Sequence, residues 1–399
     1  MLKAYKFRMY PNKQQEELIR KHIGCCRYIY NHSLSKKIEA YETEGKSLSQ
    51  YDLNKLIPKL KEEFEWLKEI NSQSLQQANN HLDCAFKKFF REKKGFPNFK
   101  SRKNPVQSFT VPQHYKVCFE ENKVIFPKIG KVKTKLHRKF KGDCKSATVS
   151  RTSTGKYFVS VLVEDGKDLP KKKRFGVNNA VGIDVGLTHF AVLSTGEKID
   201  NPKFLKKGLS RLNHFQRQAS RKQKGSSNQK KAYWKVALMH EKIGNQRRDF
   251  LHKLTHRIVG ENQAIAIESL NVKGMASNHC LAQGIYDVSW SEFFRQLEYK
   301  SEWMGKTKIE IGRFEPSSKL CNVCGEINHN LTLADREWTC SNCRTHHDRD
   351  ENAAINIKKF ALQDQNLIGQ CRRNFGVKPV EMSSVEESKK QEAPLLVGG

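Results

Sequence analysis

The sequence of 399 residues has no long apolar run. No segment approaches the roughly 18 consecutive apolar residues that a membrane-spanning helix needs. The first residues, MLKAYKFRMY, place charges where a secretory signal has an apolar stretch. We therefore expect an intracellular protein with no membrane partner.

Acidic residues are also scarce. The chain has 42 Asp and Glu against 73 Lys and Arg, a formal net charge of +31. Such an excess repels itself unless a polyanion neutralises it, so nucleic acid is the expected partner. An acidic membrane surface is the weaker alternative, because no amphipathic anchor or lipidation signal accompanies the charge.

Most cysteines lack a regular spacing, which argues against a disulfide framework and fits a reducing compartment. The exception is the C-x2-C-x15-C-x2-C pattern of Cys321, Cys324, Cys340 and Cys343. Two such pairs can close four thiolates around a tetrahedral Zn²⁺; a redox pair or buried thiols are the alternative. Because four thiolates leave no open position, the zinc would be structural, and the following His346 and His347 need not bind it.

The first half of the chain changes its hydrophobic period twice. Residues 2–9 alternate as a strand does, and a helical pattern then runs from Pro11 to about residue 92. Short β-type runs broken by Gly, Pro and Asn occupy residues 106–165. The pattern predicts a helical insert between a first strand and a later group of antiparallel strands. The basic run 169–175 is interpreted as a charged linker rather than a nuclear-localisation signal.

The second half predicts a mixed α/β sheet with helices packed on it. Residues 181–197 indicate two strands around a tight turn near Gly186, and residues 263–270 indicate a strand buried on both faces. A long basic helical stretch over 205–259 is interrupted at 225–228, and a strand is predicted over 308–314. A helix is predicted over 289–305, with one apolar face made by Trp290, Phe293, Phe294, Leu297 and Met304. The polar residues 373–399 are expected to be disordered.

Three carboxylates stand out as candidate metal ligands. Asp184 lies inside an apolar strand and Glu268 near the end of another, where each is costly unless it is paired or binds a metal. Asp350 shares a helical face with Ala353, Ala354 and Ile357, at the buried rim of that helix. A structural ion pair remains an alternative for Asp184 and Glu268.

The neighbours of Asp350 have different expected roles. We interpret Asp348 as the helix N-cap and expect Glu351 to point away from the apolar face.

Three acids, Asp184, Glu268 and Asp350, are predicted at two strand ends and a helix start. They could hold two Mg²⁺ ions about 4 Å apart, an arrangement suited to phosphodiester hydrolysis.

Six short motifs lie between residues 182 and 357: GIDVGL (182–187), IESLNVKGM (267–275), SWSEF (289–293), PSSKLCNVCG (316–325), CSNC (340–343) and HDRDENAAINI (347–357). In this order they resemble the TnpB family, the insertion-sequence-encoded relatives of type V CRISPR effectors. The catalytic Asp, Glu and Asp of that family match Asp184, Glu268 and Asp350.

The resemblance implies a multidomain α/β protein. Its expected parts are a wedge-type β-barrel (1–10 and 100–170), a helical recognition insert (11–99), a linker (171–180), an RNase H-like RuvC nuclease domain (181–320 and 346–372), and a zinc-ribbon insertion that binds target nucleic acid (321–345).

The activity implied by the resemblance is RNA-guided cleavage of DNA beside a short adjacent motif. The partners would be a guide RNA from the transposable element and the target DNA. The expected location is the bacterial or archaeal cytoplasm, at the nucleoid. An unguided RuvC-like resolvase or transposase and a non-cleaving DNA-binding regulator are the alternatives.

Two basic segments fit a protein that holds nucleic acid. Residues 201–260 contain 16 Lys and Arg but only two acids, Glu241 and Asp249, so they could contact backbone phosphates or form a solvated helical face. Residues 87–103 combine eight Lys and Arg with four Phe, suited to phosphate contact and base stacking. We expect Phe89 and Phe90 to belong to the core and the charges to make the contacts.

Overall fold

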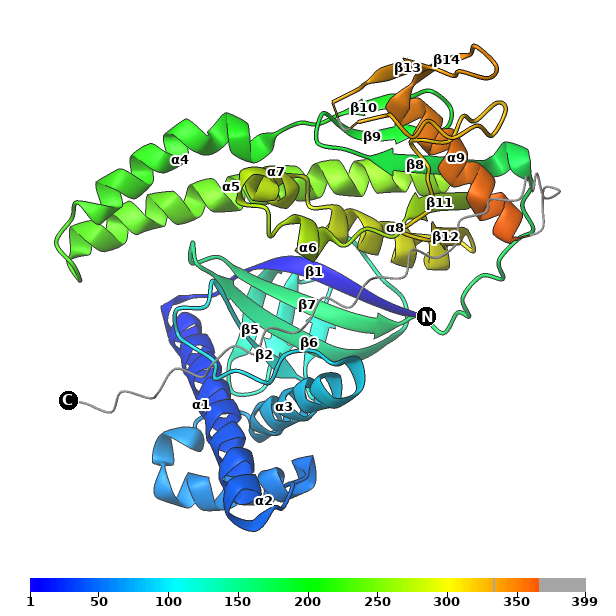
Figure 1. Cartoon of the computed structure of the whole chain (residues 1–399). Coiled ribbons are helices and arrows are strands. Elements are labelled where there is room, and N and C mark those ends of the chain that lie inside the picture. Colours follow the sequence, from blue (N-terminus) through cyan, green and yellow to red (C-terminus); the bar gives the residue numbers. More distant parts are fainter. Residues whose placement is uncertain (333, 366–399) are drawn as a thin grey trace. The chain divides into compact units, whose positions relative to one another are not determined.

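The computed structural model describes residues 1–332 and 334–365 (Figure 1). The predicted disordered segment, 373–399, lies outside these residues. By internal contacts the chain divides into two units: unit 1 comprises residues 1–172, 203–256 and 286–305, and unit 2 comprises residues 173–202, 257–285 and those from 306 onward. This grouping cuts across the domain boundaries expected from the resemblance, which stay predictions. In the described part of the chain, no helix is long and apolar enough to cross a membrane.

Unit 1 contains a seven-stranded antiparallel sheet in the order β2-β6-β7-β1-β5-β4-β3, strongly curved in Figure 1. Its strands are β1 (Leu2–Tyr10), β2 (Val106–Val111), β3 (Lys116–Cys118), β4 (Lys123–Phe126), β5 (Gly130–Lys135), β6 (Asp143–Thr152) and β7 (Tyr157–Glu164). In β7, Val159, Val161 and Val163 are fully buried while the residues between them are partly exposed, the alternation expected of a strand with one face on a core.

Between β1 and β2 in the sequence lie three helices and a 3-10 helix: α1 (Lys13–Glu44), α2 (Gln50–Glu63), η1 (Glu65–Leu67) and α3 (Ser72–Glu92). The predicted helical insert between the first strand and the later ones is therefore confirmed. Asn12 caps α1 through a reciprocal capping box with Gln15, directly after Pro11. The fully buried Ile19, Ile29 and Leu34 of α1 belong to one core with the sheet.

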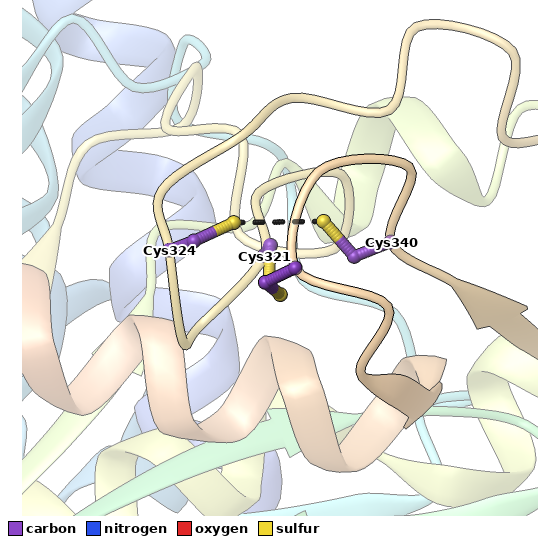
Figure 2. A group of neighbouring side chains, drawn as sticks. Cys321, Cys324 and Cys340 are labelled. Atoms are coloured by element: carbon purple, nitrogen blue, oxygen red, sulfur yellow. Dashed lines mark hydrogen bonds between the residues drawn. The ribbon is translucent and has the colours of Figure 1, made fainter.

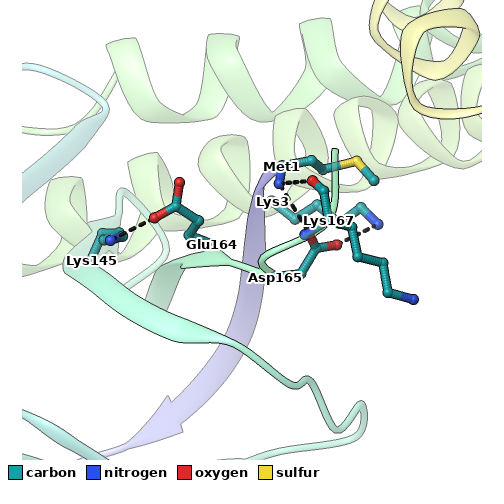
Figure 3. Close-up of polar contacts among 6 residues, drawn as sticks. All are labelled: Met1, Lys3, Lys145, Glu164, Asp165 and Lys167. Carbon is teal, nitrogen blue, oxygen red and sulfur yellow. Dashed lines mark hydrogen bonds and ion pairs between the residues drawn. The ribbon is translucent and has the colours of Figure 1, made fainter. Parts of the chain in front are cut away.

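Asp165, just after β7, connects that strand to the start of β1 (Figure 3). The Met1 amino group lies 3.0 Å from one Asp165 carboxylate oxygen and Lys3 Nζ 3.3 Å from the other. The hydrogen bond from the amino group lowers the pKa of Asp165 to about 2. Beside it, Lys145 of β6 pairs with Glu164 at 2.6 Å. These contacts hold the ends of three adjacent strands together.

The predicted basic helical stretch forms α4 (Phe204–Ser220) and α5 (Ser227–Glu261), and α7 (His279–Val288) and α8 (Trp290–Trp303) follow later. Asp287 accepts hydrogen bonds from the backbone nitrogen of Leu205 and pairs with Arg247 at 2.7 Å, so it caps the start of α4. Trp290, Phe293 and Leu297 of α8 are buried as predicted. The prediction for Met304 was wrong: α8 ends one residue earlier and Met304 is exposed, since Gly305 follows it in the left-handed region.

Unit 2 contains the predicted mixed sheet, in the order β10-β9-β8-β11-β12. Its strands are β8 (Ala180–Val185), β9 (His189–Leu193), β10 (Lys198–Asp200), β11 (Ala264–Glu268) and β12 (Thr307–Ile311). β8, β11 and β12 are parallel, and β9 pairs antiparallel with β8 and β10. The short elements are η2 (Val177–Asn179), α6 (Val272–Met275) and a hairpin of β13 (Glu337–Thr339) and β14 (His346–Asp348).

Helix α9 (Arg349–Asp364) covers one face of this sheet. Its Ile357, Ala361 and Leu362 belong to one buried cluster with Ala264 and Ala266 of β11, and with Ala180, Ile309 and Ile311. Ala353 and Ala354 are also buried, so the apolar helical face predicted from residues 350–357 is confirmed. This packing fixes the start of α9 relative to the strand ends.

Candidate active site and metal centre

Asp184 and Glu268 lie at the carboxyl ends of two neighbouring parallel strands. The β8–β11 register pairs Ile183 with Ile267, and each acid is the next residue of its strand. Residues at equivalent positions of adjacent parallel strands project to the same face of a sheet. The two carboxylates therefore project to one face at the same sheet edge.

Gly182 brings the third acid to that edge. A Cβ at Gly182 would clash with Ala354 O and lie only 2.7 Å from Lys358 N, so α9 contacts β8 backbone to backbone. Asp184 is two residues beyond Gly182 and projects to the same face of β8. Asp350 lies one helical turn before Ala354 on α9. The close approach at Gly182 thus places Asp350 beside Asp184.

The charges of the three acids act on one another. Burial, and then the negative charges of Asp350 and Glu268, raise the pKa of Asp184 to about 8. Burial also raises the pKa of Glu268. These shifts mean that the protein alone does not compensate the negative charge of the ionised site, a property that favours bound cations.

The three acids do not form a tight cage. Among the described residues, the four cysteines are the only group of three or more His, Cys, Asp or Glu whose ligand atoms all lie within 4.8 Å of one another. The three carboxylates are close enough for their charges to interact, but they are more widely spaced than the four cysteine sulfurs. Carboxylate oxygens are hard ligands of the kind that divalent cations such as Mg²⁺ prefer.

Three basic residues lie near the acids: Arg336, Arg349 and Lys198. Arg336 Nη1 lies 3.7 Å from Asp350 Oδ1, and the nearby Arg349 partly offsets the raised pKa of Asp184. Asp348 accepts hydrogen bonds from the backbone nitrogens of Asp350 and Glu351, so its predicted role as the N-cap of α9 is confirmed. Lys198 of β10 pairs with Asp348 at 2.6 Å. The roles of Lys198 and Arg336 could not be predicted from the sequence, because both depend on tertiary proximity.

The four cysteines form the predicted compact cluster (Figure 2). Cys321 Sγ lies 3.6 Å from Cys343 Sγ, and Cys324 Sγ lies 3.5 Å from Cys340 Sγ. These separations fit four sulfurs around one tetrahedral Zn²⁺. Each C-x2-C pair is followed by a residue in the left-handed region, Gly325 or Arg344, which turns the chain so that both sulfurs face inward.

His347, which the sequence analysis expects not to bind the metal, lies directly beside the cluster. Its Nε2 lies 3.1 Å from Cys321 Sγ, and its ring packs on Trp338 at a centroid distance of 4.7 Å. His346 is exposed and lies near Glu337, 3.5 Å away. A buried imidazole beside a thiolate orients the sulfur without binding the metal. We infer that His347 supports the cluster from outside.

Asn352 and Asn356 join the cysteine cluster to α9. Both are buried, and Asn356 Nδ2 donates to Ser317 O at 2.8 Å and to Leu320 O at 2.6 Å. Asn352 Nδ2 donates to Leu320 O at 2.8 Å, and its Oδ1 accepts from the backbone nitrogen of Asn322 at 3.0 Å. The first cysteine pair is thereby tied to the helix that carries Asp350. The sequence analysis missed this role of Asn352 and Asn356. Their i, i+4 spacing, which places two amides on one helical face, could have predicted it.

Family comparisons match three segments of the chain. A family described as "Probable transposase" matches residues 159–279, a "Cas12f1-like, TNB domain" matches 290–357, and a "Helix-turn-helix domain" matches 1–46. The first match contains Asp184 and Glu268, and the second contains Asp350 and all four cysteines.

Full-length relatives were also found. A "Putative RNA-guided DNA endonuclease" of Streptomyces pristinaespiralis is 40% identical over 90% of this chain and 89% of its own length. A protein of the same description from Escherichia coli K12, InsQ, is 32% identical over 89% of this chain and 91% of its own length.

Among solved structures, the cryo-EM structure of the Cas12f1–sgRNA–target DNA complex aligns with a TM-score of 0.57. The alignment covers 90% of this chain and 98% of that one at 15% identity. At this identity the likeness concerns the fold alone.

Proposed function

Because this chain belongs to the TnpB family of insertion-sequence-encoded proteins, we propose that it is an RNA-guided DNA endonuclease. The observation that carries the proposal is the convergence of Asp184, Glu268 and Asp350 at one sheet edge, in a chain 40% identical to a relative of that description. Its partners are then a guide RNA derived from the transposable element and a DNA target, consistent with the net charge of +31.

In the proposed mechanism the three carboxylates supply oxygen ligands for two divalent cations. Such ions, when bound, activate a water molecule and stabilise the leaving oxygen of a phosphodiester. Asp184 and Glu268 are held by the β8–β11 register, and Asp350 by the contact of α9 with Gly182. The acids therefore need little reorganisation to bind the ions, which is the protein's contribution to the barrier.

The cysteine cluster has a structural role in this proposal. Cys321, Cys324, Cys340 and Cys343 hold Zn²⁺, and Asn352 and Asn356 transmit the position of the first cysteine pair to α9. The segment 321–345 is then a zinc ribbon that contacts target nucleic acid.

We assign the remaining parts by analogy with the family. The sheet of unit 1 corresponds to a wedge-type barrel, and helices α1 to α3 to its recognition insert. The protein then acts in the cytoplasm of a bacterial or archaeal cell, at the nucleoid.

One experiment tests the function. The protein is co-expressed with the genomic DNA that flanks its gene, and the RNA that copurifies is sequenced. The complex then cuts a plasmid library randomised beside a matched target, in Mg²⁺, with the Asp184→Ala variant as control. We expect one discrete RNA, cleavage beside a fixed short motif, and binding without cleavage by the variant.

Each other outcome points elsewhere. Cleavage without any bound RNA would favour an unguided resolvase or transposase, in line with the "Probable transposase" family description. Guided binding by the unaltered protein without cleavage would indicate a regulator. Cleavage by Asp184→Ala would contradict the active site.

A further inference from the structure

The end of α3 and the segment after it carry a cluster of phenylalanine rings, here called the phenylalanine patch: Phe86, Phe89, Phe90 and Phe96. Ring centroids are 5.0 Å apart for Phe89 and Phe90, 5.5 Å for Phe86 and Phe96, and 5.4 Å for Phe89 and Phe96. These are ordinary distances for edge-to-face aromatic packing.

The backbone after α3 builds the patch. Helix α3 ends at Glu92, and Lys93 adopts a left-handed conformation with φ of 48°. The backbone nitrogen of Lys94 then donates to Lys88 O at 3.3 Å, which closes the helix end and reverses the chain. The reversal brings Phe96 back onto the rings of α3. Asn31 also holds both backbone groups of Lys100, at 2.7 and 2.9 Å, and so fixes the far end of the segment.

Phe86 and Phe89 are partly buried, and the outer rings of the patch are exposed. The exposed fractions are 71% for Phe90 and 45% for Phe96, and the neighbouring Phe99 is 57% exposed. The expectation that Phe90 belongs to the core was therefore wrong, because Leu82 is the last buried core residue on this helix and, beyond it, the partly buried Phe86 packs against the core of unit 1. Several exposed rings together are costly in water, and such a patch marks a surface that contacts something else.

The charges around the patch identify the class of partner. Lys87 pairs with Asp83 at 2.8 Å and Lys94 with Glu92 at 2.7 Å. Lys88, Arg91 and Lys93 are exposed and have no acidic partner within 4 Å among the described residues. Exposed rings surrounded by unpaired cations suit a polyanion that also offers flat apolar faces.

We propose that the phenylalanine patch binds unpaired bases of a nucleic-acid strand, which stack on Phe90 and Phe96 while Lys88, Arg91 and Lys93 contact the flanking phosphates. Base faces are free to stack on side chains in a single strand, whereas in a duplex they are covered by neighbouring base pairs. The inference rests on the proposed function only in that nucleic acid is the partner; it does not depend on the nuclease site.

Photo-crosslinking tests where a strand binds. The full-length protein, freed of nucleic acid in high salt, is mixed in Mg²⁺-free buffer with a 20-nucleotide DNA containing 5-iododeoxyuridine, or with the equivalent RNA containing 5-iodouridine. The crosslinked peptides are identified by mass spectrometry. We expect crosslinks to Phe90 or Phe96, and the stronger arm identifies the strand as DNA or RNA. Crosslinks confined to other segments, or none at all, would overturn the proposal.

Affinity measurements separate the rings from the charges. Phe90→Ala combined with Phe96→Ala should weaken binding of the single strand by roughly tenfold, as the loss of one or two stacked bases predicts, and leave duplex binding unchanged. Lys88→Gln combined with Arg91→Gln should weaken both and reduce the dependence of affinity on salt. The matched control is Tyr41→Ala, which removes an aromatic side chain that is 68% exposed on α1 near Glu39 and Glu44.

Three results would overturn the proposal. In the first, the Phe90 and Phe96 double variant binds the single strand as tightly as the unaltered protein. In the second, the Tyr41→Ala control loses as much single-strand affinity as the double variant. In the third, the unaltered protein is a dimer and the double variant a monomer, which would make the patch a contact between copies of the chain. Because no measurement uses cleavage, failure of the patch is distinct from failure of the proposed nuclease function.

Discussion

The cysteine cluster and the acidic site lie in the same unit and both contact helix α9, yet they differ in the type, the spacing and the sequence separation of their side chains. The four cysteines bring their sulfurs within 4.8 Å of one another, on two tight turns formed by nearby sequence. The three carboxylates come from positions 184, 268 and 350, stay further apart and repel one another. A closed set of soft ligands suits a structural ion, and an open set of hard ligands suits ions that must also bind substrate.

The largest expected difference is in catalysis. Replacing any one of Asp184, Glu268 or Asp350 by Ala should lower guided cleavage by at least about 10³-fold, because the ions contribute several kcal/mol to transition-state stabilisation. The double variants should be no worse than the single ones, since the acids act as one unit. Cleavage rates with preformed guide complexes measure this, and additive losses would mean that the acids do not share one site.

The cysteine cluster should affect stability instead. Cys340→Ser should release zinc and lower the unfolding free energy by several kcal/mol, because binding of a structural zinc contributes about 10–16 kcal/mol. Zinc content by mass spectrometry and thermal melting measure the effect. The control is Cys84→Ser, an exposed cysteine of α3. Unchanged zinc content in the Cys340 variant would refute the cluster.

A smaller effect on stability and cleavage is expected from Asn356, which connects the cysteine cluster to the helix that carries Asp350. Asn356→Ala leaves the carbonyl of Ser317 without its amide partner, a loss of about 1–3 kcal/mol for a buried group. We expect a lower melting temperature with zinc still bound, and slower cleavage because α9 also carries Asp350. The exposed Asn330→Ala is the matched control. Unaltered cleavage with reduced stability would show that the two centres are independent.

The raised pKa of Asp184 predicts a pH-dependent change in the metal-free protein. The folded state holds a proton that the unfolded state releases near pH 4, so the stability of the unaltered protein falls as pH rises from about 4 to about 8. Asp184→Asn removes this loss. At pH 8 the variant should melt higher than the unaltered protein, by roughly 2–4 °C for each kcal/mol of lost stability that the substitution restores. At pH 4 the two proteins should melt at the same temperature. A difference in melting temperature that does not vary with pH would contradict the shift.

The smallest expected effect concerns Arg336, which lies 3.7 Å from Asp350 but is largely exposed. Exposed ion pairs contribute at most about 1 kcal/mol, so Arg336→Ala should lower the half-saturating Mg²⁺ concentration for cleavage by no more than about fivefold. A titration of cleavage against Mg²⁺ measures it, with the exposed Arg138→Ala of unit 1 as control. A loss of all cleavage would give Arg336 a direct role in catalysis.

The sequence predicted those features that depend on local pattern. The cysteine spacing, the strand that contains Asp184 and the helical face of Asp350 were all visible, because each needs only a short period of residues. The contact between Gly182 and α9 could not be predicted, because nothing in the motif around Gly182 indicates that this residue contacts Ala354, 172 residues later. Phe90 was misplaced for a related reason: an apolar residue at helical spacing is buried only where another element covers it, and α3 extends beyond its cover.

The contact at Gly182 also sets an order of events during synthesis. Asp184 and Glu268 leave the ribosome well before α9, and until α9 follows, Gly182, Ala264 and Ala266 lack the helix that covers them. A nascent chain therefore carries two of the three acids on an exposed apolar sheet face and lacks the third proposed metal ligand. A chain that ends before residue 349 should bind chaperones or be degraded. Incomplete translation should therefore not produce an active nuclease.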